Sequence, residues 1–409
     1  MNRRVFLRNG TLALVSLGFA PAFIAEAAAA SQARRKILVA VFQRGAVDGL
    51  NMVVPFGDRA YYQSRPSIAI ARPGTPQGAI DLDGFFGLHP RMAPLAPLFT
   101  RGQMAIVHAA GSHDETRSHF DAQDYMESGT PGVKSTRDGW LNRYLHEREH
   151  QKASPFRAVA LAQQMPRTLQ GEAPVLAIGQ LGQFGVREAS GGPMASSFED
   201  QYAQAADALL QPAGRDAFDA VRQLQSANPA AYRPANGAEY PRSGFGDAMR
   251  QVAQIIKGDL GLEVAFTELG QWDHHANEGA ATGQLANRLD DFARGIAAFN
   301  QDLGDRMADV VLVTMSEFGR TVKENGNRGT DHGHGNAMLV LGGNVRGGKV
   351  YGRWPGLDRE KLWQGRDLAI TTDFRDVFTE LVTGHLDAND VSRIFPGYRA
   401  GARLGLLQG

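Results

Sequence analysis

The sequence contains no cysteine, and this excludes several kinds of chemistry at once. Disulfides, zinc–thiolate sites and cysteine nucleophiles all need a thiol that the chain does not have. Any metal ion must therefore be bound by histidine, aspartate, glutamate or hydroxyl oxygen. These ligands favour zinc, manganese, magnesium or calcium over metals that prefer thiolates.

The chain also lacks an excess of charge of either sign. Lysine plus arginine and aspartate plus glutamate each number 43 among the 409 residues. A protein that binds nucleic acid by neutralising phosphates normally carries a basic excess, so we expect no nucleic-acid partner. With 43% hydrophobic residues, the chain can bury a large core in one domain or two.

Beyond the N-terminus there is no long apolar run, and the N-terminal run has the pattern of an export signal. Arg3-Arg4 precedes an apolar run over Thr11–Ala25, and Ala25–Ala30 offers small residues to signal peptidase. The run is too short and too interrupted to be a good membrane span, so we expect no permanent span. We predict a twin-arginine signal peptide over 1–30, followed by a domain over 31–409 in a periplasmic or secreted protein. Its partners would be the twin-arginine export machinery and signal peptidase.

Buried strands and amphipathic helices alternate along the rest of the chain. The predicted strands cover 36–42, 103–109, 158–161, 175–178, 262–267, 310–314 and 337–341. The predicted helices cover 92–99, 116–126, 139–150, 246–257, 285–303 and 373–385. Such alternation predicts an α/β fold, with a parallel sheet covered by helices on both faces. We interpret 185–242, with helices near 199–210 and 214–226, as a cap over the site or a peripheral insertion.

The segment Val310–Gly343 carries the densest group of chemically active side chains. Glu317 and Arg320 follow its first apolar run, and His332 and His334 lie just before its second. Carboxylates and imidazoles beside strand ends, on glycine-rich turns, are typical of metal or catalytic sites.

Three more loops carry candidate residues, each with a simpler alternative. Asp48 follows the first strand but also begins an Asp-Gly turn. Asp273 and His275 follow another strand, where a run of histidines can equally be a solvated turn. Ser118, next to Arg117, stands where a helix begins, a place that suits a nucleophile with an anionic adduct or a plain N-cap. Because these loops all follow strands, one convergent site is favoured over unrelated turns.

The motifs together resemble one exported bacterial family. They are R-G-A-V-D-G-L-N at 44–51, R-S-H-F at 117–120, E-L-G-x-W-D-x-H at 268–275, S-E-F-G-R-T at 316–321 and G-T-D-H-G-H-G-N-A at 329–337. With the twin-arginine signal, they resemble the family known as domain of unknown function 1501. That family is grouped with the alkaline phosphatase-like, or sulfatase-like, metal hydrolases. The grouping implies a three-layer α/β/α sandwich with a mostly parallel central sheet and a two-metal site at its carboxyl edge.

The resemblance also implies roles for individual residues. Asp48 would be the first-strand metal carboxylate, and Ser118 would hold the place of the nucleophile. Asp273 and His275 would bind one metal. Glu317 stands where the superfamily usually has an Asp-His pair, so one metal is expected to be weaker or absent.

His332 or His334 would be the last histidine ligand of that pattern. The chain has no Cys-x-Pro-x-Arg motif, so formylglycine chemistry of the common sulfatase kind is not supported.

Two functions follow from these expectations. The first is hydrolysis of a small anionic substrate, a phosphate or sulfate ester, with one or two divalent ions and either Ser118 or a metal-activated water as nucleophile. Arg117 or Arg320 would clamp the anion through paired N–H donors. The second is a non-catalytic periplasmic binding or assembly protein on a degenerate hydrolase scaffold, which the missing Asp-His pair favours. A redox enzyme is not supported, because we find no dinucleotide-binding glycine motif and no haem motif.

Overall fold

The computed structural model describes residues 7–8, 11–12, 35–148, 154–162, 164–179, 181 and 232–408. The chain divides into two units, Met1–Arg35 and Lys36–Gly409. In the first unit, β1 (Leu7–Arg8) and β2 (Thr11–Leu12) form an antiparallel pair. Most of the predicted signal peptide over 1–30 lies outside the described residues. So do most of 185–242 and both helices predicted there.

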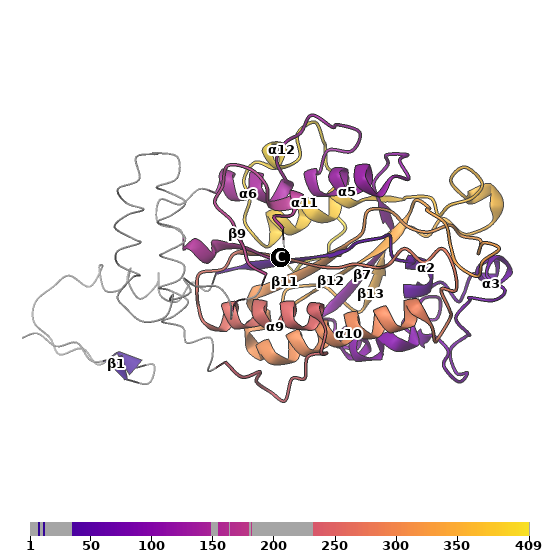
Figure 1. The fold of residues 1–409 in the computed structure, drawn as a ribbon, viewed down its shortest axis with the longest axis horizontal. Coiled ribbons are helices and arrows are strands. Elements are labelled where there is room, and N and C mark those ends of the chain that lie inside the picture. Colours follow the sequence, from indigo (N-terminus) through magenta and orange to yellow (C-terminus); the bar gives the residue numbers. More distant parts are fainter. Residues whose placement is uncertain are drawn as a thin grey trace, which may run out of the picture. The chain divides into compact units, whose positions relative to one another are not determined.

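The second unit is built on a nine-stranded sheet with the order β13-β7-β12-β11-β3-β10-β8-β9, and with β14 paired to β7 (Figure 1). The strands are β3 (Ile37–Gln43), β7 (Met104–Gly111), β8 (Ala158–Leu161), β9 (Leu176–Ala177), β10 (Val264–Leu269), β11 (Val310–Met315), β12 (Asn336–Gly342), β13 (Lys349–Tyr351) and β14 (Thr372–Asp373). All pairs in this sheet are parallel except those that β12 makes with β11 and β7. The predicted mostly parallel sheet is confirmed.

Helices cover both faces of the sheet (Figure 1). On one face lie η1 (Pro90–Leu95), α4 (Ala96–Thr100), α9 (Gly244–Lys257) and α10 (Gln284–Leu303), and on the other α5 (His119–Ser128), α6 (Trp140–Glu147), α11 (Phe374–Gly384) and α12 (Val391–Ile394). Alternate residues of a strand point to opposite faces, so β3 contributes to both cores. Its residues in the α9–α10 core are Ile37, Val39 and Val41, and those in the α6–α11 core are Leu38, Ala40 and Phe42. The predicted three-layer α/β/α sandwich is therefore confirmed.

The direction of β12 has a local cause. A parallel connection needs a crossover segment, usually a helix. Between Met315 and Asn336 the chain forms turns and isolated bridges instead, and it returns antiparallel to β11. The start of β12 consequently lies at the edge of the sheet where the parallel strands end. The loop before β12 thus shares that edge with the loops after β3 and β10.

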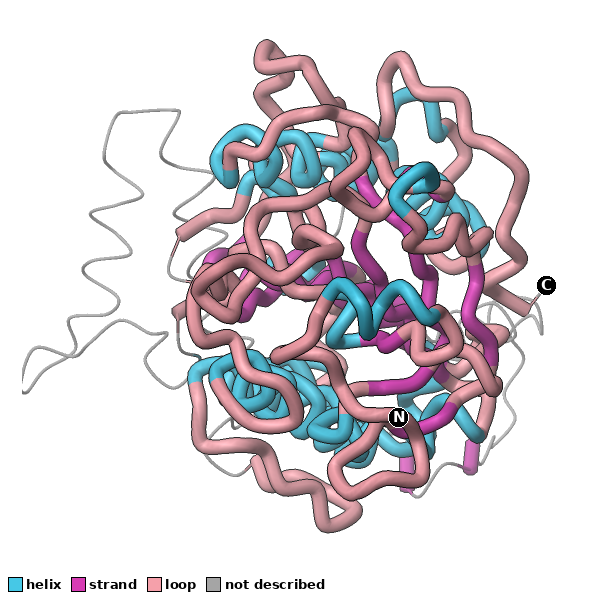
Figure 2. Tube along the Cα trace, turned by 90° about the vertical axis from the view of Figure 1, so that its right-hand side faces the viewer, coloured by secondary structure: helices cyan, strands magenta, loops and turns pink. Residues whose placement is uncertain are grey.

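Short elements and long loops surround this edge, which faces the viewer in Figure 2. They include α2 (Gly49–Met52), α3 (Arg59–Ser64) and a three-stranded sheet of β4 (Val53–Val54), β6 (Gly87–Leu88) and β5 (Ile80–Asp81). Among the described residues, no helix combines the length and the hydrophobicity that crossing a membrane requires.

Candidate metal centre at the carboxyl edge of the sheet

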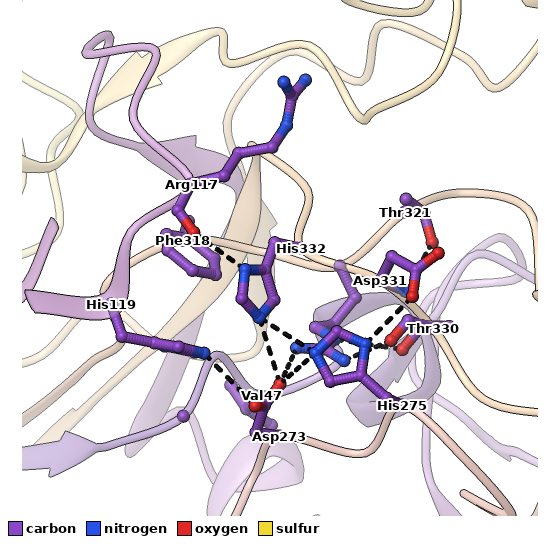
Figure 3. Close-up of polar contacts among 12 residues, drawn as sticks. Val47, Arg117, His119, Asp273, His275, Phe318, Thr321, Thr330, Asp331 and His332 are labelled. Atoms are coloured by element: carbon purple, nitrogen blue, oxygen red, sulfur yellow. Dashed lines mark hydrogen bonds and ion pairs between the residues drawn. The ribbon is translucent and has the colours of Figure 1, made fainter.

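Three imidazoles, one from the start of α5 and two from the loops after β10 and before β12, meet at this edge (Figure 3). Each is held through its Nδ1 atom. The partners are Glu317 Oε1 at 2.8 Å for His119, Asp331 Oδ1 at 2.9 Å for His275, and the backbone oxygen of Arg117 at 2.8 Å for His332. All three partners accept hydrogen bonds. In the neutral rings Nδ1 therefore carries the proton, and each Nε2 keeps its lone pair.

The three Nε2 atoms converge on one carboxylate, Asp273. His275 Nε2 lies 2.9 Å and His332 Nε2 3.3 Å from its Oδ1, whereas His119 Nε2 lies 3.4 Å from its Oδ2. The Nε2 atoms of His275 and His332 are only 3.0 Å apart. Two lone pairs at that distance repel each other unless a proton or a metal ion lies between them.

This donor set fits a divalent cation. Ligand atoms of His119, Asp273 and His332 all lie within 4.8 Å of one another. Ligands at zinc distances of about 2.0–2.1 Å in a tetrahedron stand roughly 3.4 Å apart, close to the separations found here. Among the residues that the structure describes, none forms a hydrogen bond with the buried His119 Nε2, as expected of a metal-ligand atom. Imidazoles backed by carboxylates are typical of metal ligands.

Arg320 holds the shared carboxylate in place. Its guanidinium is buried and donates to Asp273 Oδ1 at 2.6 Å and to Thr330 Oγ1 at 3.1 Å. Burial disfavours the charged form of Asp273, but the Arg320 guanidinium outweighs this and keeps the pKa of that carboxyl below its usual range. Asp273 is therefore anionic, and its Oδ2 remains directed at His119.

Glu317 supports His119 through its Oε1 atom, which accepts three hydrogen bonds. Its Oε1 accepts from His119 Nδ1, Gly45 N and Gln123 Nε2, each at 2.8 Å, and its Oε2 lies 3.2 Å from Ser316 Oγ. Burial opposes the charge, yet these donors keep the pKa of Glu317 below its usual value. The hydrogen bond to Glu317 in turn raises the pKa of His119. The structure thus gives Glu317 the place of an orienting partner behind a ligand.

Glycines allow the loops to approach one another. Gly45 has φ +113°, and a Cβ there would lie 2.9 Å from Trp272 N and 3.0 Å from Asp273 N. A Cβ on Gly333 would lie 2.3 Å from the carbonyl carbon of Arg320. The loops after β3, β10 and β11 can therefore pack backbone to backbone, which brings their side chains together.

The remaining sequence candidates lie in other surroundings. Both carboxylate oxygens of Asp48 accept from Arg65, so Asp48 is bound to the protein's own cation instead of the cluster. His334 stacks on Trp363, with ring centroids 4.0 Å apart, and burial lowers its pKa to about 4. The structure brings neither residue into the histidine cluster.

The side chains of Ser118 and Arg117 form hydrogen bonds at this edge that do not involve the three imidazoles. Ser118 is the N-cap of α5 and accepts from Asp121 N at 3.5 Å. The Arg117 guanidinium points away from the cluster and donates to Gln364 and Asp367 (Figure 3). Arg117 contributes its backbone oxygen to the site, because that oxygen orients His332.

Of the predicted residues, the structure brings Asp273, His275 and His332 together, and it adds His119, which sequence reasoning did not single out. The motif R-S-H-F indicated the correct segment. Ser118 was interpreted as its candidate residue, because its hydroxyl lies at a predicted helix start. The available signal was the position of His119, one residue later, in the first turn of α5.

Comparisons with known proteins bear on the family. A family model described as "Protein of unknown function (DUF1501)" matches residues 35–387. No curated protein matches the chain.

Several solved structures show a distant likeness. The zinc complex of the C-terminal periplasmic domain of EcEptC from Escherichia coli is 10% identical, with a TM-score of 0.36 over 76% of this chain and 74% of that chain. The PsFucS1 sulfatase from Pseudoalteromonas sp. is 13% identical, with a TM-score of 0.39 over 94% and 75%. The phosphonate monoester hydrolase of Agrobacterium radiobacter is 10% identical, with a TM-score of 0.32 over 90% and 79%. At these low TM-scores the likenesses decide neither an activity nor the site residues.

Proposed function

The chain belongs to the DUF1501 family, and from that premise we propose that it is an exported metal-dependent hydrolase of small phosphate or sulfate esters. One observation carries the proposal: three imidazoles, each oriented through Nδ1, present Nε2 to a single ionised carboxylate. Such an arrangement is repulsive without a cation and well suited to one.

The proposed ligands are His119, His332 and a carboxylate oxygen of Asp273, whose ligand atoms lie within 4.8 Å of one another, together with His275, whose Nε2 lies 2.9 Å from Asp273 Oδ1. Three imidazoles and one carboxylate suit zinc, with manganese, magnesium or calcium as alternatives. When bound, a divalent ion supplies Lewis acidity to an ester oxygen and to water. The cluster is open to solvent on one side, since the side chains of Asp273 and His275 are 40% and 44% exposed. A small anionic substrate can therefore reach it.

Residues around the ligands have supporting roles in this proposal. Arg320 keeps Asp273 ionised and oriented, and Glu317 and Asp331 hold two of the rings. Ser118 lies at the start of α5, where free backbone N–H groups stabilise an anion, and its hydroxyl is exposed. We keep it as the candidate nucleophile, with a water activated at the metal as the alternative.

The proposed place of action is the periplasm or the exterior. The twin-arginine pattern over 1–30 supports export, with the hydrolase domain over 31–409 and the segment 185–242 as its cap or insertion. Because twin-arginine cargo crosses the membrane folded, the metal can be acquired before export.

Elemental analysis and a substrate screen test the proposal together. We expect about one divalent ion per chain, as four ligands around one centre require, and turnover of an aryl phosphate, an aryl phosphodiester or an aryl sulfate. Ser118→Ala should abolish turnover and keep the metal if Ser118 is the nucleophile. Unchanged turnover in that variant would assign the attack to water. A metal-free protein without turnover on any ester would refute the hydrolase.

A second function is favoured by the surroundings of Asp48. Because Arg65 occupies both oxygens of Asp48 and three donors occupy Glu317 Oε1, the remaining ligands suit one ion instead of two. A site reduced in this way suits a non-catalytic binding or assembly protein on a hydrolase scaffold. A purified protein with neither metal nor turnover would favour this alternative.

A further inference from the structure

We propose that Gln123 and Arg44 are positioning residues of the metal centre, which fix the Glu317 carboxylate and, through it, the His119 ring. The inference rests on the proposed metal-binding function and extends it to two residues that touch no ligand atom of the ion.

The first step is the direction of the Gln123 side chain. Its Nε2 donates to Glu317 Oε1 at 2.8 Å, and its Oε1 accepts from Arg44 Nη1 at 3.1 Å. A guanidinium can only donate hydrogen bonds, so the amide oxygen must face Arg44 and the amide nitrogen must face Glu317. Arg44 thereby prevents an amide flip that would set oxygen against the Glu317 carboxylate.

The second step is that Arg44 is itself immobilised. Its Nε donates to Glu268 Oε2 at 2.5 Å, its Nη1 also donates to Glu127 Oε1 at 2.8 Å, and its guanidinium lies over the Phe42 ring at 4.3 Å. Glu127 in turn accepts from the backbone and hydroxyl of Thr168 at 2.9 Å. The guanidinium therefore connects the end of β3 with β10 and α5, and these contacts hold it in one position.

The third step is the spacing of the partners on α5. His119, Gln123 and Glu127 are four residues apart in succession, so they lie on one face of the helix. All three contact the network of Arg44 and Glu317. One helix face thus carries a proposed metal ligand, the amide that connects its orienting carboxylate to Arg44, and a carboxylate that holds Arg44.

The consequence is a defined His119 ring. With Glu317 held by Gln123, its Oε1 stays at 2.8 Å from His119 Nδ1, and Nε2 stays directed at Asp273. Loss of Gln123 frees the carboxylate to move and the ring to change tautomer. Removing a partner of this kind typically costs roughly 10–100-fold in metal affinity.

The test measures zinc affinity and the His119 tautomer in Gln123→Leu and Arg44→Met. We expect zinc affinity to fall about 10–100-fold in both variants. In the metal-free protein, ¹⁵N NMR of the imidazoles should show His119 as the Nδ1–H tautomer, and Gln123→Leu should show a mixture. Asn142→Leu is the matched control, because it removes another hydrogen-bonded amide, one that bonds the backbone of Leu169 and Ala173.

Unchanged zinc affinity and an unchanged tautomer in Gln123→Leu would overturn the inference, and so would equal losses in Asn142→Leu. If Gln123→Leu fails to fold, the isosteric Gln123→Glu replaces it, since an ionised carboxylate cannot donate to Glu317. A wild-type protein that binds no zinc would refute the metal centre itself. In that case, comparing the His119 tautomer in metal-free wild type and Gln123→Leu would still show whether Gln123 orients the His119 ring.

Discussion

Two charged clusters lie at the same edge of the sheet, one partly exposed and one buried, and their carboxylates have different partners. In the histidine cluster, Asp273 faces three imidazole lone pairs as well as Arg320. In the second cluster, Asp48 is paired through both oxygens with Arg65. The comparison teaches that a carboxylate after a strand is not by itself a metal ligand. What decides is whether the protein's own cation occupies both carboxylate oxygens, as Arg65 does at Asp48, or one of them, as Arg320 does at Asp273.

The second cluster is closed to further partners. The Arg65 guanidinium also donates to the Asn51 side chain and to the backbone oxygens of Val322 and Thr321, so its hydrogen-bonding capacity is used. Glu278 lies beside it, completely buried, and burial followed by the Asp48 charge raises its pKa well above the usual value. Arg65 neutralises Asp48, and Glu278 is protonated. This cluster therefore has no negative charge left to bind a metal ion.

The largest expected effect is on stability, in Arg65→Met. Removing the guanidinium leaves Asp48 as an unpaired buried charge, which typically costs about 3–5 kcal/mol. We expect a loss of that size in urea unfolding, with the zinc content of the folded protein unchanged. Arg65→Lys is the control, because it keeps a cation without the paired geometry. A loss of zinc in either folded variant would contradict the separation of the two clusters.

The next effect separates two histidines of one loop. His332→Ala removes a proposed ligand and should cost more zinc affinity than the roughly 10–100-fold typical of outer partners. His334→Ala should leave zinc affinity unchanged, because His334 stacks on Trp363 instead of facing Asp273. Calorimetric titration with zinc measures both. Equal losses in the two variants would refute the assignment of ligands in this loop.

The smallest effect is a change in the pH dependence of stability, in Glu278→Gln. The pKa of Glu278 is raised in the folded state, so the folded chain holds a proton that the unfolded chain releases. Wild-type stability therefore falls as pH rises above the ordinary glutamate pKa, by up to about 1.4 kcal/mol per pH unit. Glutamine cannot ionise, so the variant should gain stability relative to wild type over the first pH unit above the ordinary glutamate pKa, from about pH 5 to pH 6. Parallel curves of stability against pH for the two proteins would contradict this prediction.

The strands and helices were largely predictable because their signals are local. Runs such as Ile37–Gln43 and Val310–Met315 are apolar on both faces, which marks strands of a covered parallel sheet. The helix predicted over 285–303 agrees with α10, whose apolar stripe recurs with helical period. The antiparallel direction of β12 depends on the length and shape of one connection, and strand patterns do not carry that information.

The candidate site was predictable only in part. Asp273, His275 and His332 stood out because unusual residues gather beside strand ends. His119 did not stand out, because the orientation of its ring depends on Glu317, which is 198 positions away in the sequence. The opposite surroundings of Asp48 and Asp273 were also hidden, since Arg65 and the imidazoles reach them from separate loops.

By itself the sequence determined the α/β class, the loops that carry the chemistry and the exclusion of thiolate ligands, because composition and periodicity act over short stretches. Only the tertiary structure decided which carboxylate is left for a cation. That outcome depends on the distances between side chains from distant segments. It also depends on which side chains surround each carboxylate, Arg65 at Asp48 or three imidazoles at Asp273. The order of residues in the sequence contains no information on either point.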